Sequence, residues 1–360
     1  MFNTFRKIII LCDNFKKYLY LLIFFNSFSI IVEMISIGLL IPIGTFLFFP
    51  ELFNNNEFFL LLTNFINISD PTEQFYVLIL LLIGAYLFKF IYFVFLSWIE
   101  NLITNKIQFN LSQNLFRIFL NYKYEKFKNF KTSEINNTIF NESEIFHASL
   151  SNLIILISEI LLIISVVGFL LFINPFLVLS IISIFLIGSF LFIILILSKI
   201  KKLGSIRLQN AKLSIDNILN TFSAFIDIKI IDTSKFFHEK YIQTYSKFIN
   251  SNRLHGTLLR FPRIWIEFLL VTTFVFIFIY VKNYVNDIDN FFPLFSFMIV
   301  FSIRMLPSFN RILSSYQTIK YNSVSIDNLS SKIIFDETNQ KRLEKTKDFD
   351  EIIFDNVSFN

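Results

Sequence analysis

Basic side chains interrupt several apolar stretches of this sequence, and they are the residues best suited to bind a ligand. Arg304 and Arg311 are seven residues apart, so on a helix they lie almost on one line. Guanidinium groups hold a phosphate through two parallel hydrogen bonds and stay charged when water is removed. Lys89, Arg260 and Arg263 stand within or beside other apolar stretches. These five cations predict a binding site for an anionic group.

Acidic and polar residues in the same stretches are candidate counter-charges. Glu33 belongs to a stripe with Asn26, Ser29 and Ser36, which a helix places within about 80° of arc. We therefore include Glu33 among the candidate substrate-binding residues. Glu33 and Glu159 are either counter-charges within a helix bundle or proton-sensitive groups, and their positions do not separate these two roles.

A second interpretation gives the cations no ligand. Lys89 and Arg311 would then extend toward lipid headgroups, and Arg263 would pair with Glu267 four residues later on one helix. The pattern leaves both interpretations open, and it does not assign roles to Glu159 or Glu267.

The composition requires a lipid environment for most of the chain. Hydrophobic residues make up 54% of the 360 residues and charged residues only 16%, against about 25% charged in an average globular domain. The 51 phenylalanines and a mean hydropathy of +0.62 point the same way. We expect an integral membrane protein that is entirely α-helical.

Several kinds of site are excluded by residue type. A single cysteine, Cys12, rules out a disulfide framework, and the three histidines are too scattered to form a metal site. None of the seven glycines precedes a lysine, so the phosphate-binding loop of ATPases is missing. We expect no metal site, no catalytic residue, no bound cofactor and no ATP hydrolysis by this chain alone.

Six segments are long and apolar enough to cross a hydrocarbon core of ~30 Å. The uncharged stretch 160–198 would be about 58 Å long as one helix. Pro175 lies in its middle, so we interpret the region as a helical hairpin of two spans. The predicted spans are residues 18–49, 75–99, the hairpin from about 149 to 198, 264–281 and 291–313.

The distribution of lysine and arginine predicts the orientation. Apart from Lys89 and Lys282, they fall in four blocks that alternate with the predicted spans: residues 6–17, 106–131, 199–263 and 304–347. By the positive-inside rule both termini are cytoplasmic. A nucleic-acid site is not expected, because the blocks are separated by apolar spans. The two long stretches 100–147 and 199–260 are expected to be cytoplasmic helical extensions.

Two further segments differ from the spans. Residues 57–66 are apolar but too short to cross, and they predict either a helix lying on the membrane surface or a loop packed against the spans. Residues 331–350 are rich in charge and predict a linker after a membrane domain of residues 1–330. Residues 351–360 predict the first strand of a soluble domain that is cut off at its start.

This organisation resembles the membrane domain of an ABC exporter half-transporter. Six spans, two long cytoplasmic hairpins and a charged linker precede a strand with the family's spacing: Ile352, Phe354, Asn356, Val357, Ser358 and Phe359. The resemblance implies a domain-swapped dimer, formed with a second copy or a related half-transporter. It also implies a nucleotide-binding domain that holds ATP and Mg²⁺, and a location in the bacterial inner membrane.

Two cytoplasmic segments resemble the parts of this family that contact the nucleotide-binding domain. Residues 224–237 are similar to its G-x-K-[DE]-I-K segment, although Ala224 replaces the glycine and the first basic residue is absent. The corresponding part of the first hairpin is about residues 124–138. The resemblance implies that Asp227 and Lys229, with Lys128 and Lys131, couple the two domains. The lysines of the first hairpin are equally consistent with positive-inside charge alone.

Within the exporters, the chain resembles bacterial flippases of lipid-linked oligosaccharides. The shared features are the short outward segment 57–66, Phe261-Pro262-Arg263 with Glu267, and two arginines one heptad apart. The resemblance implies that Arg304 and Arg311, with Lys89 and Arg260 beside them, contact a pyrophosphate head. It implies lipid-tail contacts for Phe58, Phe59, Leu62 and Phe65.

Other transport activities are alternatives. Exporters of peptides, toxins or plain lipids share this architecture. A secondary transporter driven by an ion gradient would use Glu33 and Glu159 as proton carriers, but the internal repeats typical of that class are not evident. A membrane-embedded enzyme acting on polyprenyl phosphates would need clustered acidic or histidine residues, which here are scattered.

Overall fold

The computed structural model describes residues 2–12, 15–39, 71–171, 175–284 and 291–340, and within them it contains helices and no strand. The expected all-α class is confirmed. The helices are α1 (Phe2–Leu11), α2 (Lys16–Gly38), α6 (Pro71–Leu120), α7 (Tyr124–Phe127), α8 (Thr132–Asn136), the π-helix η2 (Asn137–Glu142), α9 (Ser143–Leu171), α10 (Pro175–Ser223), α11 (Phe225–Ile231), α12 (Ser234–Leu258), α13 (Phe261–Tyr284) and α14 (Phe291–Gln340).

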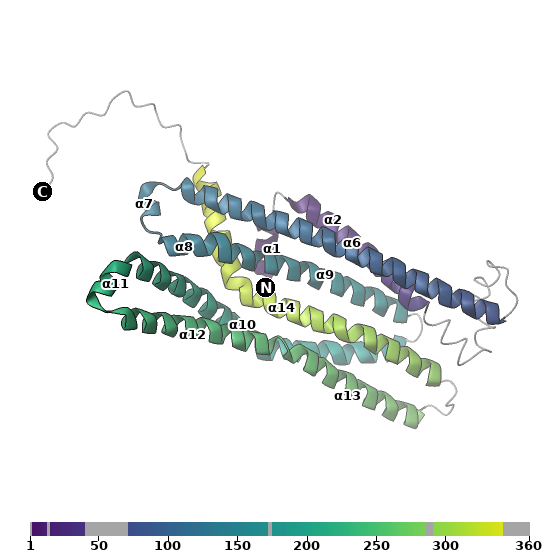
Figure 1. The fold of residues 1–360 in the computed structure, drawn as a ribbon. Coiled ribbons are helices and arrows are strands. Elements are labelled where there is room, and N and C mark those ends of the chain that lie inside the picture. The colour runs from purple at the N-terminus through teal and green to yellow at the C-terminus, as the bar shows by residue number, and fades with distance from the viewer. Residues whose placement is uncertain (1, 13–14, 40–70, 172–174, 285–290, 341–360) are drawn as a thin grey trace, which may run out of the picture.

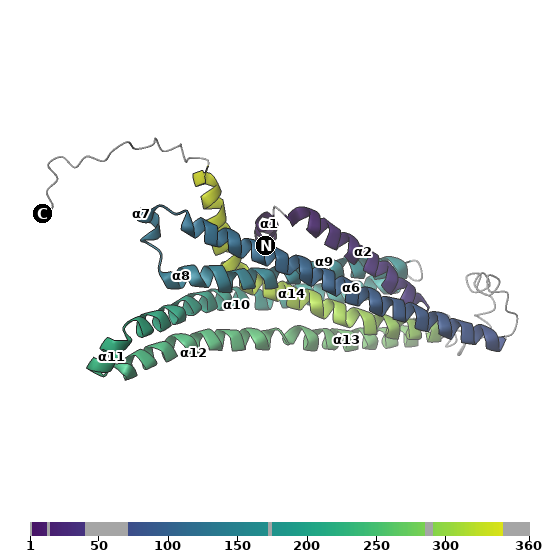
Figure 2. The ribbon, with the colours of Figure 1, turned by 45° about the horizontal axis from the view of Figure 1, so that its top comes forward.

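The long helices run side by side in one elongated bundle, with the short helices α7 and α11 at the same end (Figures 1 and 2). α6, α10 and α14 contain 50, 49 and 50 residues, so each exceeds the thickness of a bilayer. The predicted extensions are therefore continuations of membrane helices. We call residues 100–147 the first extension, which turns through α7, and residues 199–260 the second extension, which turns through α11.

Several helices are long and apolar enough to cross a membrane. Three in the described ranges meet the length and composition requirement: Lys16–Ser36, Phe75–Leu120 and Thr132–Gly168. A fourth is added if Ile182–Ile196 and Lys199–Ser223, which meet at a bend of 41°, count as one span. The chain is a multi-pass membrane protein, and the number of six spans stays a prediction.

Two prolines occupy different places in the helices, one at a helix start and one inside a helix. α10 begins at Pro175, where the missing N–H costs nothing because the first turn of a helix has no partner for it. Pro307 lies inside α14, and this helix nevertheless continues to Gln340, ten residues beyond the expected end of the membrane domain at 330. The rest of the expected linker, residues 341–350, and the expected strand 351–360 lie outside the described residues.

Three buried apolar clusters hold the bundle together. The largest joins α1, α6, α9 and α14 through side chains that include Ile107, Phe146 and Ile326. A second joins α10, α13 and α14, and a third joins α2, α9 and α14. α14 takes part in all three clusters, so it is the helix on which the others converge.

Helix α1 was not expected from the sequence, which indicated only a basic block in this region. Ile8 and Cys12 are fully buried in the largest cluster, and Lys7 forms an ion pair with Asp327 of α14. The N-terminal segment is thereby attached to the part of α14 that lies beyond the predicted sixth span.

Candidate functional site

The polar stripe of α2 faces the interior of the bundle. Asn26, Ser29, Glu33 and Ser36 are all buried, although most of the helix circumference around them is apolar. Asn26 Nδ2 donates a hydrogen bond to Glu100 Oε1 on α6 at 2.8 Å, and the hydroxyls of Ser29 and Ser36 donate to carbonyls of their own helix. The stripe therefore packs α2 against α6.

Lys89 on α6 is the cation next to this stripe. Its Nζ lies 3.2 Å from Glu33 Oε1 and above the rings of Tyr86 and Phe93, at 5.3 and 5.9 Å from their centroids. The same lysine lines an open hollow of about 490 Å³ that is mostly apolar, together with Tyr86, Phe90, Phe93, Val94 and Ser97. Lys89 thus joins an ion pair to a surface that could hold an amphiphile.

Arg311 has a comparable arrangement on α14. Its Nε lies 2.8 Å from Glu159 Oε1 on α9, and the Glu159 side chain is only 9% exposed. The other carboxylate oxygen, Oε2, is buried without a hydrogen-bond partner among the described residues. Glu159 is thereby given the role of counter-charge to Arg311, one of the two roles that its position left open.

The remaining predicted cations are placed as follows. Arg263 Nε lies 3.0 Å from Glu267 Oε1, one helical turn along α13, which is the pairing that the spacing suggested. Arg260 is exposed where α12 ends and α13 begins. Arg304 lies in α14, but its side chain is outside the described part, and so are the lipid-tail candidates Phe58, Phe59, Leu62 and Phe65. The described contacts therefore give Lys89, Arg311 and Arg263 each an acidic partner.

Exchanging Lys89 for methionine should destabilise the protein. The substitution removes the ion-pair partner of the buried Glu33 carboxylate. Removing one partner of a buried ion pair costs about 3–5 kcal/mol. We expect the midpoint of thermal unfolding in detergent to fall by several degrees. Glu33→Gln in the Lys89→Met background should recover most of the loss. Equal midpoints for the single variant and the parent would show that the pair carries no stability.

At the α7 end of the bundle, Lys131 connects the first extension to the second. Its Nζ lies 2.8 Å from Asp216 Oδ2 on α10, and Ser133 Oγ donates to Asp216 Oδ1 at 3.1 Å. The hydrogen bond from Lys131, aided by that from Ser133, lowers the pKa of Asp216. Lys128 is exposed at the same turn.

Helix α11 presents apolar side chains to solvent at the tip of the second extension. Phe225, Ile226, Ile230 and Ile231 are 50%, 72%, 77% and 69% exposed, and the charged Asp227 and Lys229 are exposed among them. Asp232 ends the helix in the left-handed conformation, with φ of 53°. An exposed apolar patch with charges among it is typical of an interaction surface.

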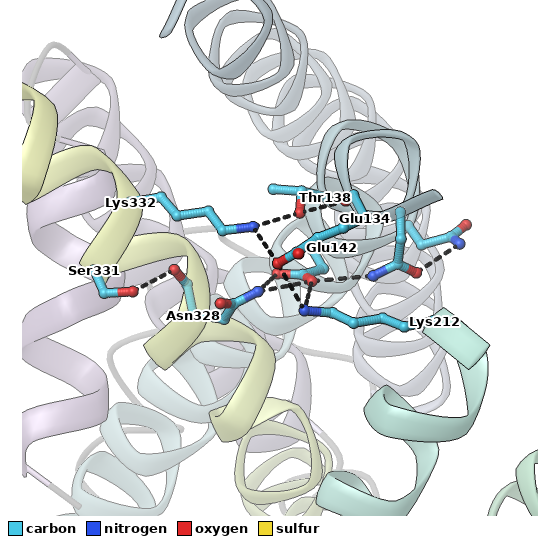
Figure 3. Close-up of polar contacts among 9 residues, drawn as sticks. Glu134, Thr138, Glu142, Lys212, Asn328, Ser331 and Lys332 are labelled. Atoms are coloured by element: carbon cyan, nitrogen blue, oxygen red, sulfur yellow. Dashed lines mark hydrogen bonds and ion pairs between the residues drawn. The ribbon is translucent and has the colours of Figure 1, made fainter. Parts of the chain in front are cut away.

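A buried charged cluster, which sequence reasoning missed, joins both extensions to α14 (Figure 3). Its centre is Glu142, whose side chain is completely buried. Asn137 Nδ2 donates to Glu142 Oε1 at 3.0 Å, and Asn328 Nδ2 lies 2.8 and 2.6 Å from the two carboxylate oxygens. Lys212 Nζ on α10 is 3.7 Å from Oε1.

Glu134 and Lys332 complete this Glu142 cluster. Glu134 Oε1 lies 3.5 Å from Lys212 Nζ and 3.3 Å from Lys332 Nζ, and Lys332 also donates to Thr138 Oγ1 at 2.8 Å. Two carboxylates of the first extension therefore meet one lysine of α10 and one of α14. The polar composition of residues 132–147 was the available signal, but it did not indicate which partners would come from distant helices.

Comparison with known proteins assigns the family. Residues 54–305, about 70% of the chain, match the family described as the ABC transporter transmembrane region. The chain belongs to this family. Among the solved structures that resemble this ABC transporter region is one titled "Structure of a bacterial Atm1-family ABC exporter with ATP bound". The match has a TM-score of 0.61 at 11% identity, and it covers 86% of this chain and 53% of that one.

The comparison confirms the expected exporter-type membrane fold with its two helical extensions. This ABC transporter region spans about half the length of the matched exporter. The likeness at 11% identity concerns the fold, so it does not identify a substrate.

Proposed function

We propose that this chain is the membrane part of an ATP-driven exporter or flippase that works as a dimer. The exposed apolar surface of α11 carries the proposal, because a surface of this kind at the tip of an extension suits a soluble partner domain. The family and the exporter fold support it. The partner is an ATPase domain that binds ATP and Mg²⁺, contacting Asp227 and Lys229 of α11 and Lys128 near α7. The basic blocks support cytoplasmic termini in a bacterial inner membrane.

For the substrate we propose an anionic amphiphile, and in the finer form a lipid-linked oligosaccharide, moved from the cytoplasmic to the outer leaflet. The hollow beside Lys89 combines aromatic walls with an ammonium group. Arg311 offers a guanidinium on a side chain that is 47% exposed. An incoming phosphate would compete with Glu33 for Lys89 and with Glu159 for Arg311, so each glutamate holds its cation until the substrate displaces it.

The test uses the product of the whole gene in proteoliposomes. A fluorescent polyprenyl-pyrophosphate oligosaccharide is incorporated, and its ATP-dependent change of leaflet is measured alongside a neutral lipid and a labelled peptide. We expect ATP-dependent movement of the pyrophosphate lipid, which Arg311→Gln reduces more than it reduces ATP hydrolysis. Movement of only the peptide or the neutral lipid would overturn the substrate assignment. Movement driven by a proton gradient without ATP would overturn the ATP-driven mechanism.

A further inference from the structure

The Glu142 cluster lies where the two extensions and α14 meet. η2 and α8 belong to the first extension, Lys212 to the part of α10 in the second, and Asn328 and Lys332 to α14 (Figure 3). The contacts join residues that are up to 198 positions apart in the sequence. The helices that carry these side chains can therefore move relative to one another only if these contacts change.

The local backbone around Glu142 departs from the ordinary α-helix. Asn137–Glu142 form a single stretch of π-helix between α8 and α9. π-Helical turns are rare and often occur at functional sites. Here the widened turn ends at Glu142, and the Asn137 and Glu142 side chains bond to each other within it.

Burial acts against the two charges at the centre of the cluster, Glu142 and Lys332. Two carboxylates face two ammonium groups, and the Arg207 guanidinium also acts on Glu142. Glu142 and Lys332 are buried, whereas Glu134 and Lys212 remain 32% and 28% exposed, so desolvation falls mainly on the first two. Desolvation raises the pKa of Glu142 despite the attraction of Lys212 and the hydrogen bond from Asn328. Desolvation likewise lowers the pKa of Lys332. Burial thus outweighs pairing for both groups, and separation with entry of water would relieve that cost.

A second group of polar contacts lies next to the cluster, near the α7 turn. Lys131 and Ser133 hold Asp216 of α10, Glu134 follows one residue later, and Asn328 and Lys332 belong to the helix that carries Arg311. The first extension is therefore held to α10 at two neighbouring places, and the contacts of the cluster continue from there to α14.

We propose that Glu142 is a coupling residue, whose contacts with Lys212 and Asn328 open and re-form in each transport cycle. When closed, they hold the first extension against α10 and α14; when open, they release α14. This inference rests on the proposed ATP-driven function. Glu142 acts through the helices it connects and does not contact the transported molecule.

The test is Glu142→Gln in the full-length protein, reconstituted in proteoliposomes. Glutamine keeps the shape but removes a charge, which leaves Lys212 and Lys332 with Glu134 as their carboxylate. We expect ATP hydrolysis to remain within about twofold of the parent while substrate moved per ATP falls at least about fivefold. Glu144→Gln is the matched control, because Glu144 is exposed two residues away, and it should behave as the parent.

A distance measurement separates coupling from simple stability. Spin labels on cysteines introduced at the exposed positions Asn136 and Ser331 report the separation of α8 and α14; the native Cys12 is buried. We expect the parent to change between a short and a long distance with nucleotide state, and Glu142→Gln to favour the long distance in every state. Asn328→Ala, which removes the contact from the α14 side, should do the same, and it replaces Glu142→Gln if that variant fails to fold.

Two results would overturn the inference while leaving the proposed function intact. One is a label distance in the parent that nucleotide does not change although transport proceeds. The other is a Glu142→Gln protein, or an Asn328→Ala protein, that moves as much substrate per ATP as the parent. A parent that neither hydrolyses ATP nor responds to it would instead refute the proposed function, and the coupling role with it.

Discussion

Substitution of both Ile226 and Ile230 by aspartate is expected to reduce ATP-driven transport at least about tenfold and to leave the membrane part folded. The two side chains are the most exposed apolar groups of α11, so their loss removes little packing within the chain. If an ATPase domain covers them, each aspartate brings a charge into an apolar contact. A few buried apolar anchors carry most of the binding energy of an interface, commonly 2 kcal/mol or more each.

Transport and ATP hydrolysis by the reconstituted full-length protein measure this effect. The matched control is the pair Ile242→Asp and Ile249→Asp on α12, which are also exposed isoleucines of the second extension but lie away from its tip. The control pair should retain transport. Full activity of the α11 variant would contradict the contact between α11 and an ATPase domain, on which the proposed function depends.

Gly204→Ala should destabilise the packing of the second extension against α14. A Cβ at this position would lie 2.0 Å from the carbonyl oxygen of Tyr321, and a backbone atom in the middle of α14 cannot turn aside. Next to this contact, the rings of His255 and Tyr321 stack at 3.6 Å, and Ser251 Oγ donates to the carbonyl of Leu203 at 2.6 Å. The methyl group would push α10 from α14, and α12, which contacts both helices here, could not keep both contacts; we expect a cost of about 1–3 kcal/mol.

Thermal unfolding of the purified protein in detergent measures the loss, and we expect the midpoint to fall by several degrees. Gly256→Ala is the control, because nothing lies within 4 Å of a Cβ built there on α12. Alanine is the better helix former and stabilises a helix interior by roughly 0.5–1 kcal/mol relative to glycine. This control should therefore unfold at the same temperature as the parent or at a higher one. If the two variants have the same unfolding midpoint, the close approach of α10 and α14 at Gly204 does not limit the size of the residue there.

Local features of the fold followed from the sequence because they depend on residues close together in the chain. Pro175 marks the start of α10 because the first turn of a helix tolerates a residue without an N–H donor. The pairing of Arg263 with Glu267 follows from one turn of helix. The extensions were expected as helical hairpins because their polar sequences still have helical character, and the structure shows them as continuations of α6 and α10.

The contacts between distant helices could not be predicted in the same way. Nothing near Glu142 in the sequence indicates that Asn328 and Lys212 are its partners, because that depends on how three helices pack. The same is true of the pairs Lys89–Glu33 and Arg311–Glu159. The sequence indicated these residues as candidate cations and counter-charges, but it did not indicate which would pair. Pro307 lies inside α14, which nevertheless continues to Gln340, because packing in all three apolar clusters outweighs the lost hydrogen bond.

The continuity of α6 makes it a lever. A helix of 50 residues is about 75 Å long, and residues 100–120, which follow the predicted span 75–99, make up about 31 Å of it. A tilt of about 10° within the membrane displaces the far end of this part by about 5 Å relative to its start, without any bending of the extension. Small rearrangements around Lys89 and Glu33 would therefore be magnified at the α7 turn, and a probe placed there would report motion that is hard to detect at the hollow itself.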